Sequence, residues 1–200
     1  MFFFVMKIWF LVRKTVCLIF GTLFGNLIMR LWGCRLGGMV RCFGIPHIEL
    51  SRAGSVAVGR RNIFRSSYLS NPAGITTRML LATRGNGTIS IGSECGFSGT
   101  VIVSEKSVEI GDRVLVGAGC VIADTDFHPV DAAQRRIPHA PGACRPVVIE
   151  DDVFIGMHCI ILKGSHIGAG SVIAAGSVVT GELPAGVVAG GAPAKVIRQA

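Results

Sequence analysis

The first ninety residues contain a single acidic residue, Glu49, although they hold twelve lysines and arginines. This part of the chain carries a net charge of about +11, and the remainder carries about −3. Such a shortage of acids points to an anionic partner, either a membrane surface or a nucleic acid. No nucleic-acid recognition motif is present, and the basic residues are interleaved with a strongly apolar segment. We therefore expect a membrane surface and no nucleic acid.

Two further shortages, of paired cysteines and of aromatic residues, indicate the cellular compartment and the kind of core. No CxxC pair occurs among the seven cysteines, whose number is odd. A secreted disulfide framework is therefore not expected, and the sequence favours a reducing cytoplasm with Cys120 and Cys159 as small core residues. Aromatic residues make up only 7% of the 200 residues, whereas glycine is abundant. This composition suits a core of aliphatic side chains.

An internal repeat organises the second half of the chain. Across residues 147–180, branched aliphatic residues recur at intervals of six: Ile149, Ile155, Ile161, Ile167, Ile173 and Val179. A period of six is neither the 3.6 of a helix nor simple strand alternation, so it describes a supersecondary unit. Each aliphatic side chain can point inward while glycine, which tolerates positive φ, turns the corners. Stacked turns of this kind form a parallel β-helix, an all-β solenoid.

The same period occurs earlier in the chain, with interruptions. It is carried by Ile91, Phe97 and Val103 and, after one extra residue, by Ile110, Val116 and Ile122. Residues 37–88 show only a ragged pattern, which predicts irregular first coils. The period lapses again over residues 123–148, and this lapse predicts a loop that projects from one corner. Protruding loops of this kind are usually functional.

Residues 1–36 are strongly apolar apart from scattered basic residues such as Lys7. The uncharged run over residues 15–29 is shorter than the ~20 residues that a spanning helix needs. We expect one or two helices that lie in the inner face of a membrane, with Trp9 and Trp32 at the headgroups. The alternatives are a single tilted span and a helix that caps the solenoid or packs in an oligomer. No small-residue cleavage site follows, which argues against a secretory signal.

The predicted loop carries the residues best suited to chemistry. It opens with the segment DTDFHPVD, residues 124–131, and Arg135 follows shortly after. Histidine is the side chain best suited to proton transfer near neutral pH, and the neighbouring carboxylates could orient it. We therefore regard His128 as the leading candidate for a general base.

The six-residue repeat and the His-Pro-x-Asp segment resemble the hexapeptide-repeat O-acetyltransferases, which act on galactosides, maltose and cell-surface polysaccharides. The resemblance implies a left-handed β-helix, a homotrimer, acetyl-CoA as the acyl donor and no metal. It implies that His128 takes a proton from a sugar hydroxyl, which then attacks the thioester. Asp126 and Asp131 are further catalytic candidates, and Asp124 and Arg135 are candidates for contacts with the acceptor.

The C-terminal residues add a second match, because residues 190–198 resemble the closing motif of that family. The resemblance implies that the following residues contact coenzyme A: Phe154, Gly156, Ala174, Ala175, Thr180, Lys195 and Arg198. The chain departs from the usual residues of the family at Gly119, Phe154, Gly181 and Ala192.

Together these patterns predict a membrane-associating segment over residues 1–36 and an acyltransferase domain over 37–200, with a C-terminal cap over 181–200. The expected enzyme is cytoplasmic and peripheral on the inner face of the cell membrane, and it O-acetylates a polysaccharide or lipid-linked glycan precursor. An acyl-carrier-protein donor and a non-catalytic membrane-attached scaffold stay open as alternatives. A zinc carbonic anhydrase on the same solenoid needs three His ligands, and the spacing of His158 and His166 disfavours it.

Overall fold

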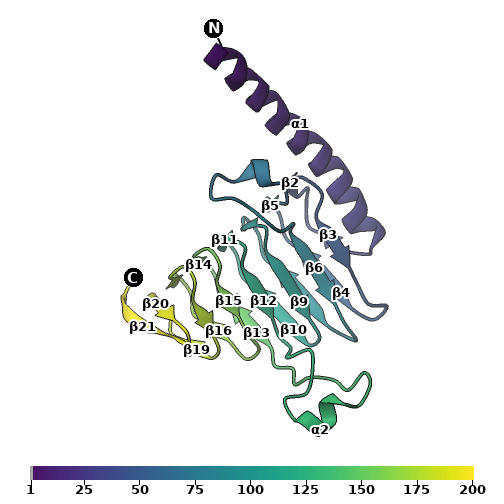
Figure 1. Cartoon of the computed structure of the whole chain (residues 1–200), viewed down its shortest axis with the longest axis vertical. Helices are drawn as coiled ribbons and strands as arrows, with labels where there is room; N and C mark the ends of the chain where they lie inside the picture. The colour runs from purple at the N-terminus through teal and green to yellow at the C-terminus, as the bar shows by residue number, and fades with distance from the viewer. Residues whose placement is uncertain (1) are drawn as a thin grey trace.

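The computed structural model describes residues 2–200 and consists of one long helix followed by a three-sided solenoid (Figure 1). Met1, the first residue of the predicted membrane segment, lies outside the described residues. Helix α1 spans Phe2–Leu31, so the segment forms one helix and not two. Nothing in its sequence breaks it, because the chain has no proline before Pro46. The helix ends at Leu31, and Gly33 follows with a φ of 84°, which suits the left-handed residue that comes after a helix.

The solenoid strands form three parallel sheets, and each coil contributes one strand to each sheet except the last coil, which contributes none to sheet C. Sheet A contains β1 (Arg35–Leu36), β4 (Ser55–Val58), β7 (Thr88–Ile91), β10 (Ser107–Ile110), β13 (Val147–Ile149), β16 (His166–Ile167) and β19 (Glu182–Leu183). Sheet B contains β2 (Arg41–Phe43), β5 (Ile63–Arg65), β8 (Gly96–Ser98), β11 (Leu115–Ala118), β14 (Phe154–Ile155), β17 (Val172–Ile173) and β20 (Val187–Gly191). Sheet C contains β3 (His47–Glu49), β6 (Leu80–Thr83), β9 (Val101–Ser104), β12 (Val121–Ala123), β15 (Ile160–Ile161) and β18 (Val178–Val179). A final strand, β21 (Ala194–Gln199), returns antiparallel to β20.

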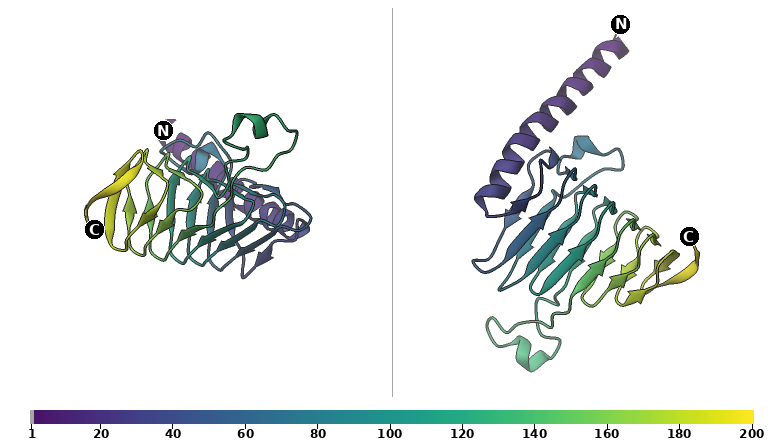
Figure 2. Two further views of the ribbon diagram at one scale, coloured as in Figure 1. Left: turned by 90° about the horizontal axis from the view of Figure 1, so that it is seen from below. Right: turned by 180° about the vertical axis from the view of Figure 1, so that it is seen from behind.

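Because the chain passes from sheet A to B to C in each complete coil, a complete coil has three corners. We name them after the sheets that they join: residues 150–153 form one A–B corner, residues 156–159 one B–C corner and residues 162–165 one C–A corner. The views in Figure 2 show these corners stacked along the length of the solenoid. The parallel sheets and the six-residue period fit the left-handed β-helix that the resemblance implies.

The six-residue period corresponds to an inward-facing column of side chains. Ile149, Ile155, Ile161, Ile167 and Ile173 are at most 1% exposed. Each stacks on its counterpart in the next coil, as Ile149 does on Ile167 and Ile155 on Ile173. The predicted core positions of Cys120 and Cys159 are confirmed, because both side chains are fully buried. The core is therefore a continuous aliphatic column.

The predicted register is wrong in two places. Residues 37–88 were expected to be irregular, but β1 to β6 pair in register with the coils that follow, and only the loop over residues 66–79 departs from the pattern. In the third coil Ile102, and not Val103, points inward and stacks on Ile122. The corner before it, at Gly99, is one residue shorter than the corner of the next coil, and β8 and β11 shift register there.

The second half of α1 covers the open N-terminal end of the solenoid. Gly21, Gly25 and Met29 are buried and follow one another at a spacing of four, which places them on one helix face. Asn26 pairs with the backbone of Val40: its amide nitrogen donates to the carbonyl oxygen (2.7 Å) and its amide oxygen accepts from the backbone nitrogen (3.0 Å). The capping alternative is therefore confirmed for this half of the helix.

The first half of α1 projects away from the solenoid (Figure 1). Its apolar side chains are exposed all round, as the exposed fractions of Phe3 (72%), Trp9 (52%) and Leu11 (64%) show. Among the helices of residues 2–200, none combines the length and the apolar composition that a membrane crossing requires.

The column makes a direct prediction about stability. Ile161→Ala removes a fully buried side chain, whereas Ile160 is its neighbour on β15 and is 39% exposed. Ile161→Ala should lower the free energy of unfolding by about 3 kcal/mol because it leaves a cavity in the core. Ile160→Ala should cost less than about 1 kcal/mol. Urea unfolding followed by circular dichroism measures both, and equal losses would contradict the inward column.

Candidate active site on the projecting loop

The excursion that interrupts the repeat covers residues 124–146 and projects from the C–A corner between β12 and β13 (Figures 1 and 2). It leaves the solenoid as a narrow ribbon, in which Thr125 pairs antiparallel with Cys144 and the backbone nitrogen of Asp126 donates to Ala143 (3.0 Å). At the far end lies the short helix α2 (Ala132–Arg135). The loop is thus a hydrogen-bonded projection with a fixed base.

Asp124 forms that base and does not face an open site. Its side chain is fully buried. Its carboxylate accepts hydrogen bonds from the Ser104 hydroxyl (2.7 Å) and from the backbone nitrogens of Glu105 and Lys106 (2.8 Å each). These donors belong to the corner of the preceding coil, so Asp124 joins two coils. The predicted acceptor contact of Asp124 is therefore replaced by a structural role.

His128 lies at the outer part of the ribbon with an exposed side chain. Its backbone nitrogen donates to the carbonyl oxygen of Asp126 (2.6 Å). Gly142 permits this tight turn, because a Cβ at that position would come within 2.7 Å of the His128 nitrogen. The local backbone thus fixes the position of the His128 main chain, while the imidazole ring is exposed to solvent.

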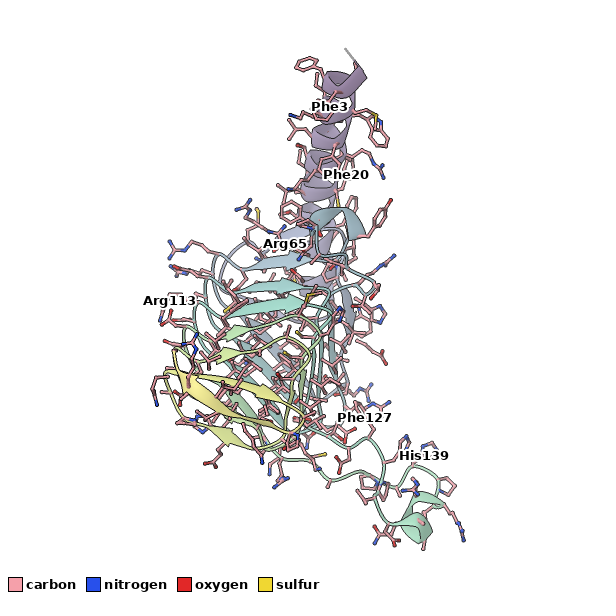
Figure 3. All side chains as sticks on the ribbon, turned by 60° about the vertical axis from the view of Figure 1, so that its left-hand side comes forward. Phe3, Phe20, Arg65, Arg113, Phe127 and His139 are labelled. Atoms are coloured by element: carbon pink, nitrogen blue, oxygen red, sulfur yellow. The ribbon has the colours of Figure 1, made fainter. Side chains whose placement is uncertain are left out.

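A cavity of about 690 Å³ opens beside His128. Its charged and aromatic lining consists of Arg84, Glu105, Phe127, His128, Arg135, Arg136 and His139. Figure 3 shows Phe127 and His139 on the projecting loop, far from α1. Arg84 stacks on the Phe127 ring at 5.7 Å and lies 3.8 Å from Glu105, the only acid of the lining. The cavity is therefore basic and is large enough for a small saccharide.

Asp126 makes an ion pair that the sequence did not reveal. Its carboxylate accepts from the Lys163 ammonium at 2.7 Å, and the two side chains are only 25% and 21% exposed. Lys163 belongs to the next C–A corner, so the pair ties the loop to the coil below. No motif marks Lys163, because the partners are 37 residues apart and meet only when the coils stack.

Asp131 and Arg135 fold the loop on itself. The Asp131 carboxylate accepts from the backbone nitrogen of Gln134 (2.8 Å) and so caps the N-terminus of α2. The Arg135 guanidinium donates to the carbonyl oxygens of Pro129 (3.1 Å) and Val130 (2.8 Å). Neither group contacts the His128 imidazole through any hydrogen bond found in residues 2–200. Both side chains hold the shape of the loop that carries His128.

A family model of the bacterial transferase hexapeptide (six repeats) matches residues 146–181. The chain carries the hexapeptide repeat. A 2,3,4,5-tetrahydropyridine-2,6-dicarboxylate N-acetyltransferase of Staphylococcus aureus is 44% identical over 90 residues, which are 45% of this chain and 32% of the relative. The chain thus spans about a third of the length of the curated relatives that it matches.

Two solved structures resemble most of the chain. A maltose O-acetyltransferase from Clostridium difficile 630 is 25% identical with a TM-score of 0.50, over 96% of this chain and 88% of that chain. A galactoside acetyltransferase in complex with coenzyme A is 25% identical with a TM-score of 0.50, over 87% of this chain and 68% of that chain. The resemblance to the hexapeptide-repeat acetyltransferases is confirmed.

The residues predicted to contact coenzyme A lie on several parts of the hexapeptide-repeat solenoid. Gly156, Ala174 and Ala175 lie together at the B–C corner, where a Cβ on Gly156 would meet the Ala175 backbone nitrogen at 2.6 Å. Phe154 is 47% exposed on β14, at the outer face of sheet B. Thr180 lies at the C–A corner.

The remaining two, Lys195 and Arg198, are exposed on β21 at the C-terminal end.

The B–C corner and the loop with His128 lie at opposite edges of sheet C, because the loop leaves from the C–A corner. One chain does not bring the two predicted halves of the site together.

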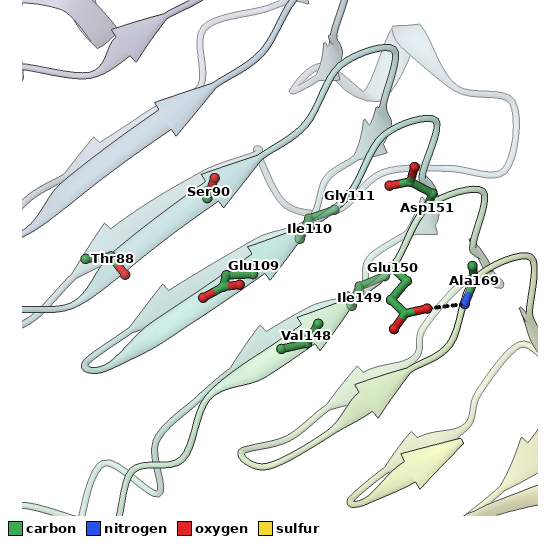
Figure 4. Close-up of a pocket in the computed structure, with 10 residues that line it drawn as sticks. All are labelled: Thr88, Ser90, Glu109, Ile110, Gly111, Val148, Ile149, Glu150, Asp151 and Ala169. Atoms are coloured by element: carbon green, nitrogen blue, oxygen red, sulfur yellow. Dashed lines mark hydrogen bonds between the residues drawn. The ribbon is translucent and has the colours of Figure 1, made fainter. Parts of the chain in front are cut away.

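A second hollow, of about 750 Å³, lies on the outer face of sheet A (Figure 4). Its acids are Glu109, Glu150 and Asp151. The pKa of Glu150 is lowered because its carboxylate bonds to the His166 imidazole (2.7 Å) and accepts from the Ala169 nitrogen (2.8 Å). This acidic surface would repel the phosphates of coenzyme A, so we prefer the basic cavity as the candidate site although it is slightly smaller.

The histidines of the chain are dispersed over the solenoid. His128 lies on the loop, His158 at the B–C corner and His166 on sheet A. Within residues 2–200, no group of three His, Cys, Asp or Glu side chains is arranged to hold a metal ion.

The ion pair between Lys163 and Asp126 can be tested without knowing the substrate. Lys163→Met should raise the amide hydrogen-exchange rates of residues 125–128 about tenfold, because a charge-assisted, half-buried bond of roughly 1.5 kcal/mol is lost. Lys163→Arg should keep most of the protection. Lys106→Met, an exposed neighbour in the preceding C–A corner, is the matched control. Unchanged exchange in Lys163→Met would show that the pair does not hold the loop.

Proposed function

We propose that this protein is an acetyl-CoA-dependent O-acetyltransferase that acts on a sugar hydroxyl of a cell-surface polysaccharide or lipid-linked glycan precursor. The observation that carries the proposal is the exposed His128 imidazole beside a basic cavity, on a loop that interrupts a hexapeptide-repeat solenoid. The named activities of the galactoside and maltose acetyltransferases support an O-linked sugar acceptor. The coenzyme A in the galactoside enzyme supports the donor.

The proposed chemistry is a direct transfer. The His128 imidazole takes the proton of the sugar hydroxyl as the oxygen attacks the thioester carbonyl of acetyl-CoA. The tetrahedral intermediate then expels the coenzyme A sulfur, which receives that proton from the imidazolium. A positioned base makes a hydroxyl a competent nucleophile, and no covalent enzyme intermediate is required if donor and acceptor are held together. Asp126, Asp131 and Arg135 support this role by holding the loop.

The charge of the cavity bears on the acceptor. Arg84, Arg135 and Arg136 line it against the single acid Glu105. The excess of positive charge favours a saccharide that carries a carboxylate or a phosphate. The Staphylococcus aureus relative is named as an N-acetyltransferase, which makes an amine acceptor the second candidate. An amine is largely a cation at neutral pH, so this cavity would bind it less well than an acidic or neutral sugar.

A homotrimer is part of the proposal. His128 and the predicted coenzyme A residues Gly156, Ala174 and Ala175 belong to opposite edges of sheet C in one chain. An active site between subunits would bring the loop of one copy to the B–C corner of another. We infer that neither edge of sheet C forms a complete active site alone, and that acetyl-CoA binds in the groove between two copies of the chain.

The membrane association of the exposed half of α1 is likewise proposed. A row of exposed apolar side chains this long is costly in water and is stabilised by insertion into the acyl region. Lys7, Arg13 and Lys14 would then lie near the anionic headgroups of the cytoplasmic leaflet. The enzyme would thus be peripheral on the inner face of the cell membrane.

Loss of the proposed base should abolish turnover but not donor binding. His128→Ala should lower kcat by about 10²–10⁴ with little change in the KM for acetyl-CoA, because a general base contributes that much in the transition state. His139→Ala, in the same cavity, should keep kcat within about fivefold. Release of free coenzyme A and formation of acetylated product are measured on neutral, acidic and amino saccharides. Full turnover by His128→Ala would refute the assignment, and product only with amino sugars would favour the amine acceptor.

Removal of the exposed half of α1 should release the protein from membranes. Deleting residues 2–16 keeps the contacts of Thr22, Asn26 and Met29 with the first coil. The truncated protein should therefore lose most of its recovery with membranes, with its thermal midpoint unchanged within a few degrees. Sedimentation of cell fractions and a thermal melt measure the two outcomes. Undiminished recovery with the membranes would mean that α1 is not the anchor.

A further inference from the structure

Two hollows flank the place where α1 meets the first coils. One, of about 310 Å³, is lined by Leu18, Ile19, Thr22 and Leu23 of α1 and by Arg41 of β2. The other, of about 500 Å³, lies between Cys17 of α1 and the loop over residues 66–79, and Arg78 lines it. Each hollow therefore combines a wall from the helix with an arginine from the solenoid.

Arg41 and Arg65 form a pair of like charges at this junction. They lie on β2 and β5, neighbouring strands of sheet B. The pKa of Arg65 is lowered, first by burial and second by the positive charge of Arg41. Figure 3 shows Arg65 at the base of α1.

Contacts hold Arg65 in this position. Its guanidinium stacks on the Phe43 ring at 4.9 Å and donates to the Ser70 carbonyl oxygen at 2.8 Å. Arg65 is thus fixed beside Arg41 although the two charges repel each other.

No acid offsets this pair. Within residues 2–200, no ion pair involves Arg41, Arg65 or Arg78. The one acid of the first ninety residues, Glu49, lies on sheet C beside His47. Two guanidiniums held together without a counterion gain most from an anion with several oxygens, which can accept hydrogen bonds from both.

We propose that the junction of α1 with the first coils is a binding site for an anionic phospholipid, with the phosphate between Arg41 and Arg65 and an acyl chain along Leu18, Ile19 and Leu23. This inference rests on the membrane association proposed above. The apolar wall distinguishes a lipid from a free phosphate or a nucleic acid, neither of which would use it. The lipid would thus bind the solenoid itself, and not only the helix, to the bilayer surface.

The site fixes how the solenoid meets the membrane. α1 and the loop over residues 66–79 lie toward one end of the long axis, and the loop with His128 lies toward the other (Figures 1 and 2). With the first coils at the headgroups, the cavity beside His128 faces the aqueous phase. A bound lipid therefore orients the enzyme as well as retaining it.

The test compares full-length protein on two kinds of vesicle, one of phosphatidylcholine alone and one with about a third phosphatidylglycerol. Arg41→Gln/Arg65→Gln is the test variant. Arg52→Gln/Lys106→Gln is the control, because it removes the same charge from exposed positions at the C–A corner. The test variant should lose roughly ten- to thirtyfold in partitioning onto the anionic vesicles, and the control less than about twofold. All three proteins should bind phosphatidylcholine vesicles equally.

Each outcome separates the lipid site from membrane association. Wild-type protein that binds neither vesicle would overturn the membrane association and the site with it. Equal losses in the test and control variants, or equal wild-type binding to both vesicles, would overturn the site while leaving the apolar anchor in place. Thermal melts of the variants in solution show whether the solenoid is intact.

Discussion

Every coil of this protein depends on the backbone hydrogen bonds that it makes with the coils on either side. A strand of two or three residues, such as β15 or β16, has no stability of its own and forms only because the column stacks. The same dependence makes the two ends of the stack a problem, since an end coil presents unpaired N–H and C=O groups. At the N-terminal end, the side chains of Asn26 and Thr22 of α1 make hydrogen bonds with the backbone of Val40 and Cys42. At the C-terminal end β21 turns back and pairs antiparallel with β20.

Stacking also decides where chemistry can occur. The flat faces are committed to pairing and the interior to aliphatic packing, so insertions are possible only at the corners. Both long excursions use a corner: residues 66–79 leave at the B–C corner and residues 124–146 at the C–A corner. The second is held by contacts between coils, namely Asp124 with the turn above and Asp126 with Lys163 below. The rigidity of this loop is thus supplied by the solenoid and not by the loop alone, as a catalytic loop would require.

The period of six made the architecture and the loop predictable, because each inward position is a local consequence of its own hexapeptide. Contacts between coils were not predictable in the same way. The role of Asp124 depends on three donors from another coil, and Lys163 approaches Asp126 only through the pitch of the stack. Ile102 points inward in place of Val103 because the preceding corner is one residue shorter, and the six-residue period of the sequence does not show where such a shortening occurs. The regular coils over residues 37–88 were missed because their inward positions are occupied by residues as different as Phe64, Leu81 and Cys42.

The position of α1 relative to the loop constrains the acceptor. The exposed half of the helix and the loop with His128 lie at opposite ends of the long axis (Figure 1). If the helix end enters the bilayer, the solenoid lies between the lipid headgroups and the cavity. A short lipid-linked sugar would remain at the membrane surface, whereas a longer saccharide chain could reach the cavity. For the proposed transferase, this arrangement favours an extended glycan as the acceptor, and the basic lining of the cavity favours one that carries negative charge along its length.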